Sequence, residues 1–412
     1  MNKPMTVWYH MAAAPHRSFF LVGALQGVMT LLWWIFDLAG RYGFLDAVPV
    51  WSVAPTWAHA FLMIYGFFPF FIFGFLFTTY PNWLAGEKIK ARDFLATCLL
   101  MAVGVVLFYF GLASSKSILI SGVAVMLAGW SIAFYTLLRV LIGASGQDKR
   151  HAKVISVALG FGCLGVAAYL LWLLTDSWAM LNFSRVAGIW FFLLPIVMTV
   201  SHRMIPFFSS RVLENYVLVR PYWMLWLMLA CSVGHGLLQW LEALPYLWLV
   251  DFPLAICALY LSFTWGFLRS FRVSLLAVLH LSFAWLGLAM LLYGAQSLML
   301  LLSDDGIMSF GLAPLHALAI GYFASIVLGM ASRVTLGHSG RPLVLDNFTW
   351  LLFIGFQATT IFRVAADIVP AFAPMTSMLY LLAAFIWLIC FSLWAVRYVP
   401  IFWQQRMDGK PG

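Results

Sequence analysis

Long apolar runs separated by short polar segments make up almost the whole chain. A helix needs about 20 mostly apolar residues to cross the hydrocarbon core of a bilayer. The runs of this length lie at residues 18–40, 55–80, 94–113, 117–141, 154–174, 184–205, 221–241, 246–268, 273–302, 312–332, 345–369 and 374–396. The pattern predicts an all-α polytopic membrane protein with about 12 transmembrane helices, forming a single transmembrane domain over residues 1–412.

Composition agrees with this class. Hydrophobic residues make up 64% of the chain and charged residues only 9%, whereas soluble domains are about one quarter charged. The start of the chain is too polar for a cleaved signal peptide, so we expect the first run to be retained. The five cysteines form no CxxC pair, which leaves no zinc-knuckle or c-type haem attachment motif.

Basic residues indicate the orientation, because Lys and Arg are enriched in short cytoplasmic loops. With twelve spans and both termini inside, all but four of the 23 Lys and Arg residues lie on the inner side. The four exceptions are Arg41, Lys116, Arg185 and Arg363. The basic residues thus flank membrane spans, and we expect a lipid bilayer rather than nucleic acid as the partner.

Three histidines are predicted at one outer level of the membrane. His59 and His316 lie in the first turns of the second and tenth spans, soon after Pro55 and Pro314. Both spans run from outside to inside. His235 is near the outer end of the seventh span. Ionisable residues inside a membrane are functional candidates because burying them without a partner is costly.

Three further histidines are predicted at an inner level: His202, His280 and His338. His316 and His338 are 22 residues apart, about 33 Å along a helix, so the two levels cannot share one metal. The remaining histidines, His10, His16 and His151, are interpreted as parts of a polar arm and a solvated basic loop.

Metal or haem ligation is the functional interpretation of these histidines. Imidazole is a usual ligand of copper and of haem iron, and two histidines from different helices at one depth can hold a haem. The alternative is that each histidine forms a hydrogen bond to a neighbouring helix. The matched depth of His59 and His316 favours ligation more for this pair than for the others.

The segment LGMASRVTLGHSGRP (328–342) adds arginines at the inner level. Two of them, Arg333 and Arg341, lie in this segment, and Arg203 is at the same level in the sixth span. These three arginines have two interpretations. Flanking charge of the kind that sets orientation explains most basic residues here. A guanidinium can also hold a carboxylate in a fork, either a haem propionate or a protein acid such as Asp346. We therefore predict a second, inner polar centre.

The longest of these motifs carries a family resemblance. The segment LHALAIGYFASIVLGMASRVTLGHSGRPL (315–343) resembles the signature of the NnrS family. Shorter blocks support it in the same order: HRSFF (16–20), GFLFTTYPNW (74–83), RMIPFFS (203–209) and LHLSFAWLGL (279–288). The family comprises polytopic membrane proteins described as binding haem and copper and linked to the bacterial nitric oxide response. The resemblance implies haem b and copper as cofactors, a diatomic ligand such as nitric oxide, and the bacterial inner membrane.

Two positions depart from the family pattern. The second span of the family usually contains a sequence like HAHEM, whereas here Phe61 and Leu62 follow His59-Ala60 in place of the second His and the Glu. In the sixth span, His202 stands where the family has a small residue before the Arg. These departures bear most on copper.

The topology is also similar to that of the catalytic subunit of haem–copper oxidases and nitric oxide reductases. In those proteins histidines of the second and tenth spans hold the low-spin haem. Here the sixth span has no outer-level His, so the usual three-His copper site is not evident. His235 is the remaining candidate ligand for a second metal.

The prediction is an integral membrane haem, or haem–copper, protein acting in nitric oxide response, detoxification or reduction. If it is an enzyme, we expect an oxidoreductase acting on nitric oxide, with an electron donor that the sequence does not identify. One alternative is a transporter or channel for a small metabolite or metal complex, using the histidines as substrate contacts. Another is a sensor or assembly partner without turnover.

Overall fold

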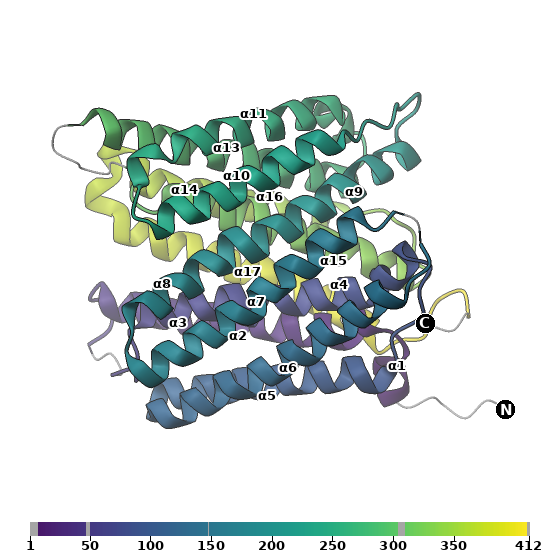
Figure 1. The fold of residues 1–412 in the computed structure, drawn as a ribbon, viewed down its shortest axis with the longest axis horizontal. Helices are drawn as coiled ribbons and strands as arrows, with labels where there is room; N and C mark the ends of the chain where they lie inside the picture. The colour runs from purple at the N-terminus through teal and green to yellow at the C-terminus, as the bar shows by residue number, and fades with distance from the viewer. Residues whose placement is uncertain (1–6, 47–49, 147, 304–309, 410–412) are drawn as a thin grey trace. The chain divides into compact units, whose positions relative to one another are not determined.

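The structure is a computed structural model that describes residues 7–46, 50–146, 148–303 and 310–409 (Figure 1). Within these residues the chain is helical and contains no strand. The prediction of an all-α polytopic membrane protein is confirmed, because the described residues contain 11 helices long and apolar enough to cross a membrane.

The helices form two compact units. Unit 1 comprises Met1–Phe192, Ala331–Leu343 and Phe391–Gly412, and unit 2 comprises Leu193–Met330 and Val344–Cys390. The prediction of a single transmembrane domain stays a prediction.

Unit 1 is built around a pair of long helices, α5 and α6, followed by α7 beside α6 (Figure 1). The α5 and α6 backbones come close together at Gly111, where an added Cβ would collide with the backbone of Leu119. Small residues allow such close helix packing in membranes. The helices of this part of the chain are α1 (Val7–Ala13), α2 (Pro15–Arg41), α3 (Pro55–Phe61), η1 (Leu62–Phe67), α4 (Phe68–Trp83), α5 (Ala91–Ser114), α6 (Lys116–Gly143), α7 (Arg150–Thr175), α8 (Trp178–Val186) and η2 (Ala187–Leu193).

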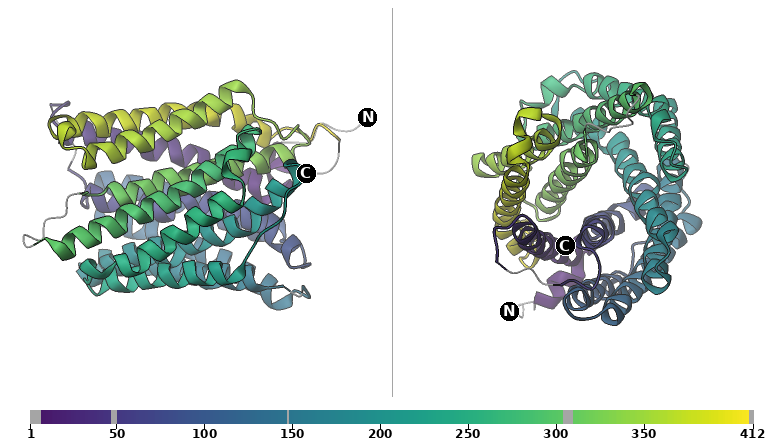
Figure 2. Two further views of the ribbon diagram at one scale, coloured as in Figure 1. Left: turned by 90° about the horizontal axis from the view of Figure 1, so that it is seen from above. Right: turned by 90° about the vertical axis from the view of Figure 1, so that its left-hand side faces the viewer.

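In unit 2, α11 packs against both α10 and α13; these are among the teal and green helices of Figures 1 and 2. The helices from residue 194 onward are α9 (Leu194–Val212), α10 (Tyr222–Trp240), η3 (Leu244–Tyr246), α11 (Trp248–Thr264), α12 (Phe267–Ser270), α13 (Ser274–Leu302), α14 (Ala313–His316), η4 (Ala317–Ala324), α15 (Ser325–His338), α16 (Asn347–Ile368), η5 (Pro370–Met375) and α17 (Thr376–Phe402). The last turns of α15 and α17 belong to unit 1.

One predicted boundary needs correction, and one predicted span forms a helix that falls outside the candidate spans. The tenth span was expected to end at residue 332, but α15 continues to His338, so Arg333 lies within the helix rather than in its exit. The seventh predicted span forms α10, a helix of 19 residues that is not among the eleven candidate spans. Polar residues in its second half, such as His235 and Gln239, lower its mean hydropathy.

Every fourth predicted span contains a π-helical segment. The segments η1, η2 and η4 lie in the second, sixth and tenth predicted spans. These three spans are also the most buried of the eleven, at 89%, 78% and 78% of their apolar windows. Single-turn π segments inside α-helices are frequently found at functional sites. The residues beside these three segments are therefore candidates for a functional site.

Candidate functional site

His59 lies in the last turn of the short helix α3, three residues before η1 begins, and its ring stacks on Trp34 of α2. The ring centroids are 4.0 Å apart and the planes are inclined by 12°. The guanidinium of Arg41 lies over the same indole at 5.1 Å. Asp37, which is buried, accepts hydrogen bonds from Arg41 at 2.5 Å and from the indole N–H of Trp51 at 3.0 Å. An ion pair between exposed Arg41 and buried Asp37 therefore supports the indole against which His59 packs.

His316 ends α14, directly before η4, and its Nδ1 lies 3.0 Å from the backbone oxygen of Leu312. A carbonyl oxygen can only accept, so Nδ1 carries the proton and Nε2 keeps its lone pair. The N–H of Leu312 in turn donates to Asp367 of α16 at 3.1 Å. Asp367 also binds Arg363 at 2.8 Å and the hydroxyl of Tyr380. This carboxylate thus anchors the turn that orients His316.

The two elements share a sequence pattern. His59 and His316 are each followed by Ala and, six positions later, by a tyrosine within the π segment. The Tyr65 hydroxyl donates to the backbone oxygen of Ser184 at 2.6 Å. Tyr322 and Ser201 have their hydroxyl oxygens 3.0 Å apart. The pattern His-Ala-x4-Tyr was legible in the sequence, but only the structure shows that both copies run into π-helices.

His235 forms the most buried polar pair of unit 2. Its Nδ1 lies 2.6 Å from Oδ1 of Asp251 on α11, and both side chains are at most 1% exposed. The ring of Tyr293 packs edge-on to the imidazole, with centroids 4.9 Å apart. Sequence reasoning identified His235 but missed Asp251, although an acid within the apolar run WLVDFPL was the available signal.

The inner-level residues of unit 2 are His202, His280 and Arg203. His202 is buried, with Nε2 at 3.3 Å from the backbone oxygen of Pro221. His280 places Nε2 at 2.9 Å from the hydroxyl of Ser209, and its buried Nδ1 has no hydrogen-bond partner among the described residues. Arg203 is half-buried. Ser209, the partner of His280, is in the last turn of α9. Pro221, the partner of His202, follows the end of this helix. Both imidazoles are therefore held by polar atoms at or after the C-terminal end of α9.

The other predicted inner-level residues, Arg333, His338 and Arg341, belong to unit 1. The grouping of these three with His202 and His280 stays a prediction. Within unit 1, His338 meets a different histidine. Its ring centroid lies 4.9 Å from that of His16, which is only 3% exposed. The interpretation of His16 as part of a polar arm is therefore wrong.

Next to His16, the side chain of Arg17 is buried and connects the start of α2 to the end of α17. Its Nη1 donates to the backbone oxygens of Phe402 at 3.3 Å and Gln404 at 3.0 Å. The side-chain oxygen of Gln404 accepts from Nη2 of Arg341 at 2.6 Å. Arg406 donates hydrogen bonds to Asp408, which raises the pKa of Arg406 above its usual value. The Arg406 guanidinium therefore stays charged.

A comparison with protein families assigns this chain to a family. The family model described as NnrS protein matches residues 10–406. The chain belongs to the NnrS family. It is accordingly a multi-pass membrane protein linked to the nitric oxide response. A search of curated proteins finds no match for it.

This NnrS protein packs apolar side chains at the two positions where it departs from the family pattern. Phe61 is 1% exposed and stacks on Tyr169, with ring centroids 4.1 Å apart. Leu62 is fully buried. Neither side chain offers a ligand atom.

Metal ligands are sparse in this NnrS protein. Among the described residues, no group of three or more His, Cys, Asp and Glu side chains is arranged to hold a metal ion. Pairs are present instead, at His235–Asp251 and His16–His338. A metal held here would take few protein ligands.

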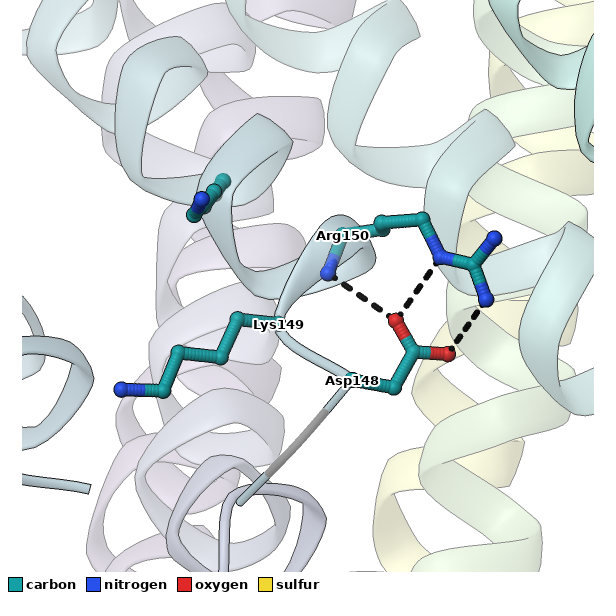
Figure 3. A pocket seen from close by; sticks show the side chains of 4 residues that line it. Asp148, Lys149 and Arg150 are labelled. Atoms are coloured by element: carbon teal, nitrogen blue, oxygen red, sulfur yellow. Dashed lines mark hydrogen bonds and ion pairs between the residues drawn. The ribbon is translucent and has the colours of Figure 1, made fainter. Parts of the chain in front are cut away.

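The basic segment before α7 forms an open depression lined by Asp148, Lys149, Arg150 and Lys153. Figure 3 shows the carboxylate of Asp148 bonded to the backbone and guanidinium of Arg150, at 2.9 to 3.2 Å. The depression holds charge but no histidine or cysteine. His151 beside it is 1% exposed, which corrects its interpretation as a solvated loop residue.

Proposed function

We propose that this NnrS protein is a haem protein of the bacterial inner membrane that acts in nitric oxide detoxification or reduction. His59 and His316 are the proposed haem ligands, and His235 is the proposed ligand of a second metal, for which copper is the candidate. Nitric oxide or another diatomic molecule is the proposed ligand, and the electron donor is open.

One observation carries the proposal: the hydrogen bond from Nδ1 of His316 to the Leu312 carbonyl. Histidines that ligate metals almost always give their other ring N–H to a carbonyl, carboxylate or water, which fixes the tautomer and orients the ring. His316 has this arrangement. His316 is half-buried at the end of α14, and its Nε2 carries a lone pair that suits haem iron.

His235 shows the same arrangement with a stronger acceptor. Asp251 accepts from Nδ1 of His235, which leaves Nε2 for a metal. A carboxylate partner raises the basicity of the imidazole and fixes its orientation. Burial of the pair strengthens this effect, since the charge of Asp251 is poorly screened there. The pair therefore fits a metal ligand with its supporting acid.

When bound, haem would supply a redox-active iron atom. The protein residues hold and orient the group. The inner-level arginines Arg203, Arg333 and Arg341 are proposed to neutralise carboxylates, including haem propionates, through forked hydrogen bonds. Arg333 is the most buried of the three, at 8% exposure, which favours a bound anion over plain solvent exposure.

The test is a reduced-minus-oxidised absorption spectrum of the purified, full-length protein. We expect b-type haem bands in the wild type, and their loss or a marked shift in both His316→Ala and His59→Ala. His151→Ala is the control, because His151 also lies in a helix and is more deeply buried than either, but is not a proposed ligand. Bands that survive both ligand substitutions would refute the assignment, and a wild type without chromophore would favour the transporter alternative.

A further inference from the structure

A buried arginine at the start of α2 binds only backbone oxygens. Arg17 is 2% exposed, and its hydrogen bonds all run from Nη1, to the backbone oxygens of His10, Phe402 and Gln404. The last two lie at or just after the C-terminal end of α17. A helix C-terminus carries only about half a negative charge, so it does not neutralise the guanidinium. Nε and Nη2, the edge that can grip an oxyanion in a fork, form no hydrogen bond among the described residues.

A second arginine contacts the same segment. Nη2 of Arg341 donates to the side-chain oxygen of Gln404 at 2.6 Å, and its buried Nη1 has no hydrogen-bond partner among the described residues. In the part of the chain that the structure describes, no carboxylate pairs with Arg17 or Arg341. Their neighbour Arg406 is paired with Asp408. Because buried charges are normally paired, the first two guanidiniums call for an anion from outside the chain.

Two histidines border these arginines. The rings of His16, next to Arg17, and His338, three residues before Arg341, have centroids 4.9 Å apart. The positive charge of Arg17 acts on both imidazoles. A gathering of cationic groups repels a metal cation and attracts an anion. An anion there also stabilises the protonated imidazole, which donates from both ring nitrogens.

The position of these groups in the membrane narrows the choice of anion. Arg17 is in the first turn of the candidate span Pro15–Arg41, and Arg341 follows the end of the candidate span Ala313–His338. A helix of 27 residues such as α2 is about 40 Å long, close to the thickness of a bilayer with its headgroups. The arginines are therefore expected at headgroup level. The Lys and Arg pattern predicts the cytoplasmic side, where basic pockets between helices bind anionic lipids.

We propose that Arg17 and Arg341, bordered by His16 and His338, bind a phosphate group, supplied by the headgroup of an anionic phospholipid. A guanidinium fork matches two oxygens of a phosphate. The bound lipid would join the start of α2 to the segment after α17, which both arginines contact through Gln404. The site uses none of the proposed haem and second-metal ligands.

The experiment is a thermal-unfolding titration of the purified, full-length protein in detergent with dioleoylphosphatidylglycerol. Dioleoylphosphatidylcholine, which has no net charge, is the control lipid. We expect the anionic lipid to raise the unfolding midpoint saturably. Arg17→Gln and Arg341→Gln are each expected to raise the half-saturating lipid fraction about 10-fold or more, because they remove hydrogen bonds to a charged group. Arg341 is only half-buried, so its variant serves if Arg17→Gln does not fold.

Arg150→Gln is the control variant. Arg150 is exposed on the same predicted side and pairs with Asp148, so we expect its loss to change half-saturation by less than about twofold. Equal half-saturation in the wild type, Arg17→Gln and Arg341→Gln would overturn the proposal. An equal weakening in Arg150→Gln would also overturn it, because general surface charge would then explain the effect.

Sodium phosphate, compared with sodium chloride at equal ionic strength, forms a second arm. A midpoint shift with phosphate but not with the lipid, lost in Arg341→Gln, would support the site and assign it to a free phosphate ion. Haem spectra of the same samples separate this proposal from the haem proposal. We expect the haem content of Arg341→Gln to equal that of the wild type. A parallel loss of haem and of the lipid effect would assign Arg341 to a propionate and overturn the phosphate site.

Discussion

At the scale of single residues, the contact between His235 and Asp251 has the largest energetic consequence. Both side chains are at most 1% exposed and their polar atoms are 2.6 Å apart. Oδ2 of Asp251 has no partner among the described residues. Removing one member of such a pair leaves the other buried and uncompensated, which costs about 3 to 5 kcal/mol. The pair is thus poorly explained as a stabilising device and better explained as a functional one.

We expect the thermal unfolding midpoint to fall in the order wild type, Asp251→Asn, Asp251→Leu. The amide oxygen of Asn still accepts from Nδ1 of His235, whereas Leu offers no acceptor and orphans the imidazole. Intrinsic tryptophan fluorescence of the purified protein measures the midpoint. Asp176→Asn is the control, because the exposed pair of Asp176 with Lys116 contributes at most about 1 kcal/mol. Equal midpoints for the two Asp251 variants would contradict the hydrogen bond.

At the scale of helices, the tyrosine of the π segment η1 makes a close contact with two neighbouring helical segments. In η1, the hydroxyl of Tyr65 reaches α8 between two glycines, Gly165 on α7 and Gly188 in η2. An added Cβ at Gly165 would collide with this hydroxyl. The glycine is therefore required by the close approach of a side chain.

Gly165→Ala is accordingly expected to destabilise the protein by about 1 to 3 kcal/mol, the usual cost of overpacking. The same substitution at Gly160 in the same helix is the matched control. Its Cβ would have at least 3.6 Å of clearance, and Ala is a better helix former than Gly by up to about 1 kcal/mol. Denaturation midpoints of both variants test this. Equal losses at the two positions would show that Tyr65 is not tightly held.

The helices could be predicted from the sequence because apolar runs of span length have few alternatives in a membrane. Their π segments could not, since hydrophobic spacing does not report a change from i→i+4 to i→i+5 bonding. Histidines such as His16 and His151 were misjudged for a related reason. Their sequence neighbours are polar or basic, and only tertiary packing buries them.

At the scale of the whole molecule, orientation depends on α10. The inner location of nearly all Lys and Arg residues assumes twelve spans, of which α10 is the one that falls outside the eleven strongest candidates. If α10 spans the membrane, both termini are on the same side. If it does not, every segment after it changes sides, and the basic residues no longer collect on one face as expected for membrane proteins.

Single cysteines placed on either side of α10 decide this, in a variant that lacks the five native cysteines. Val217, before α10, and Glu242, after it, are both exposed. We expect Glu242→Cys to react with a membrane-impermeant maleimide on intact cells and Val217→Cys to react only after permeabilisation. Asp176→Cys, on an exposed residue between α7 and α8, is the outer reference. Labelling of both Val217→Cys and Glu242→Cys from the same side would show that α10 does not cross, and would place the two termini on opposite sides.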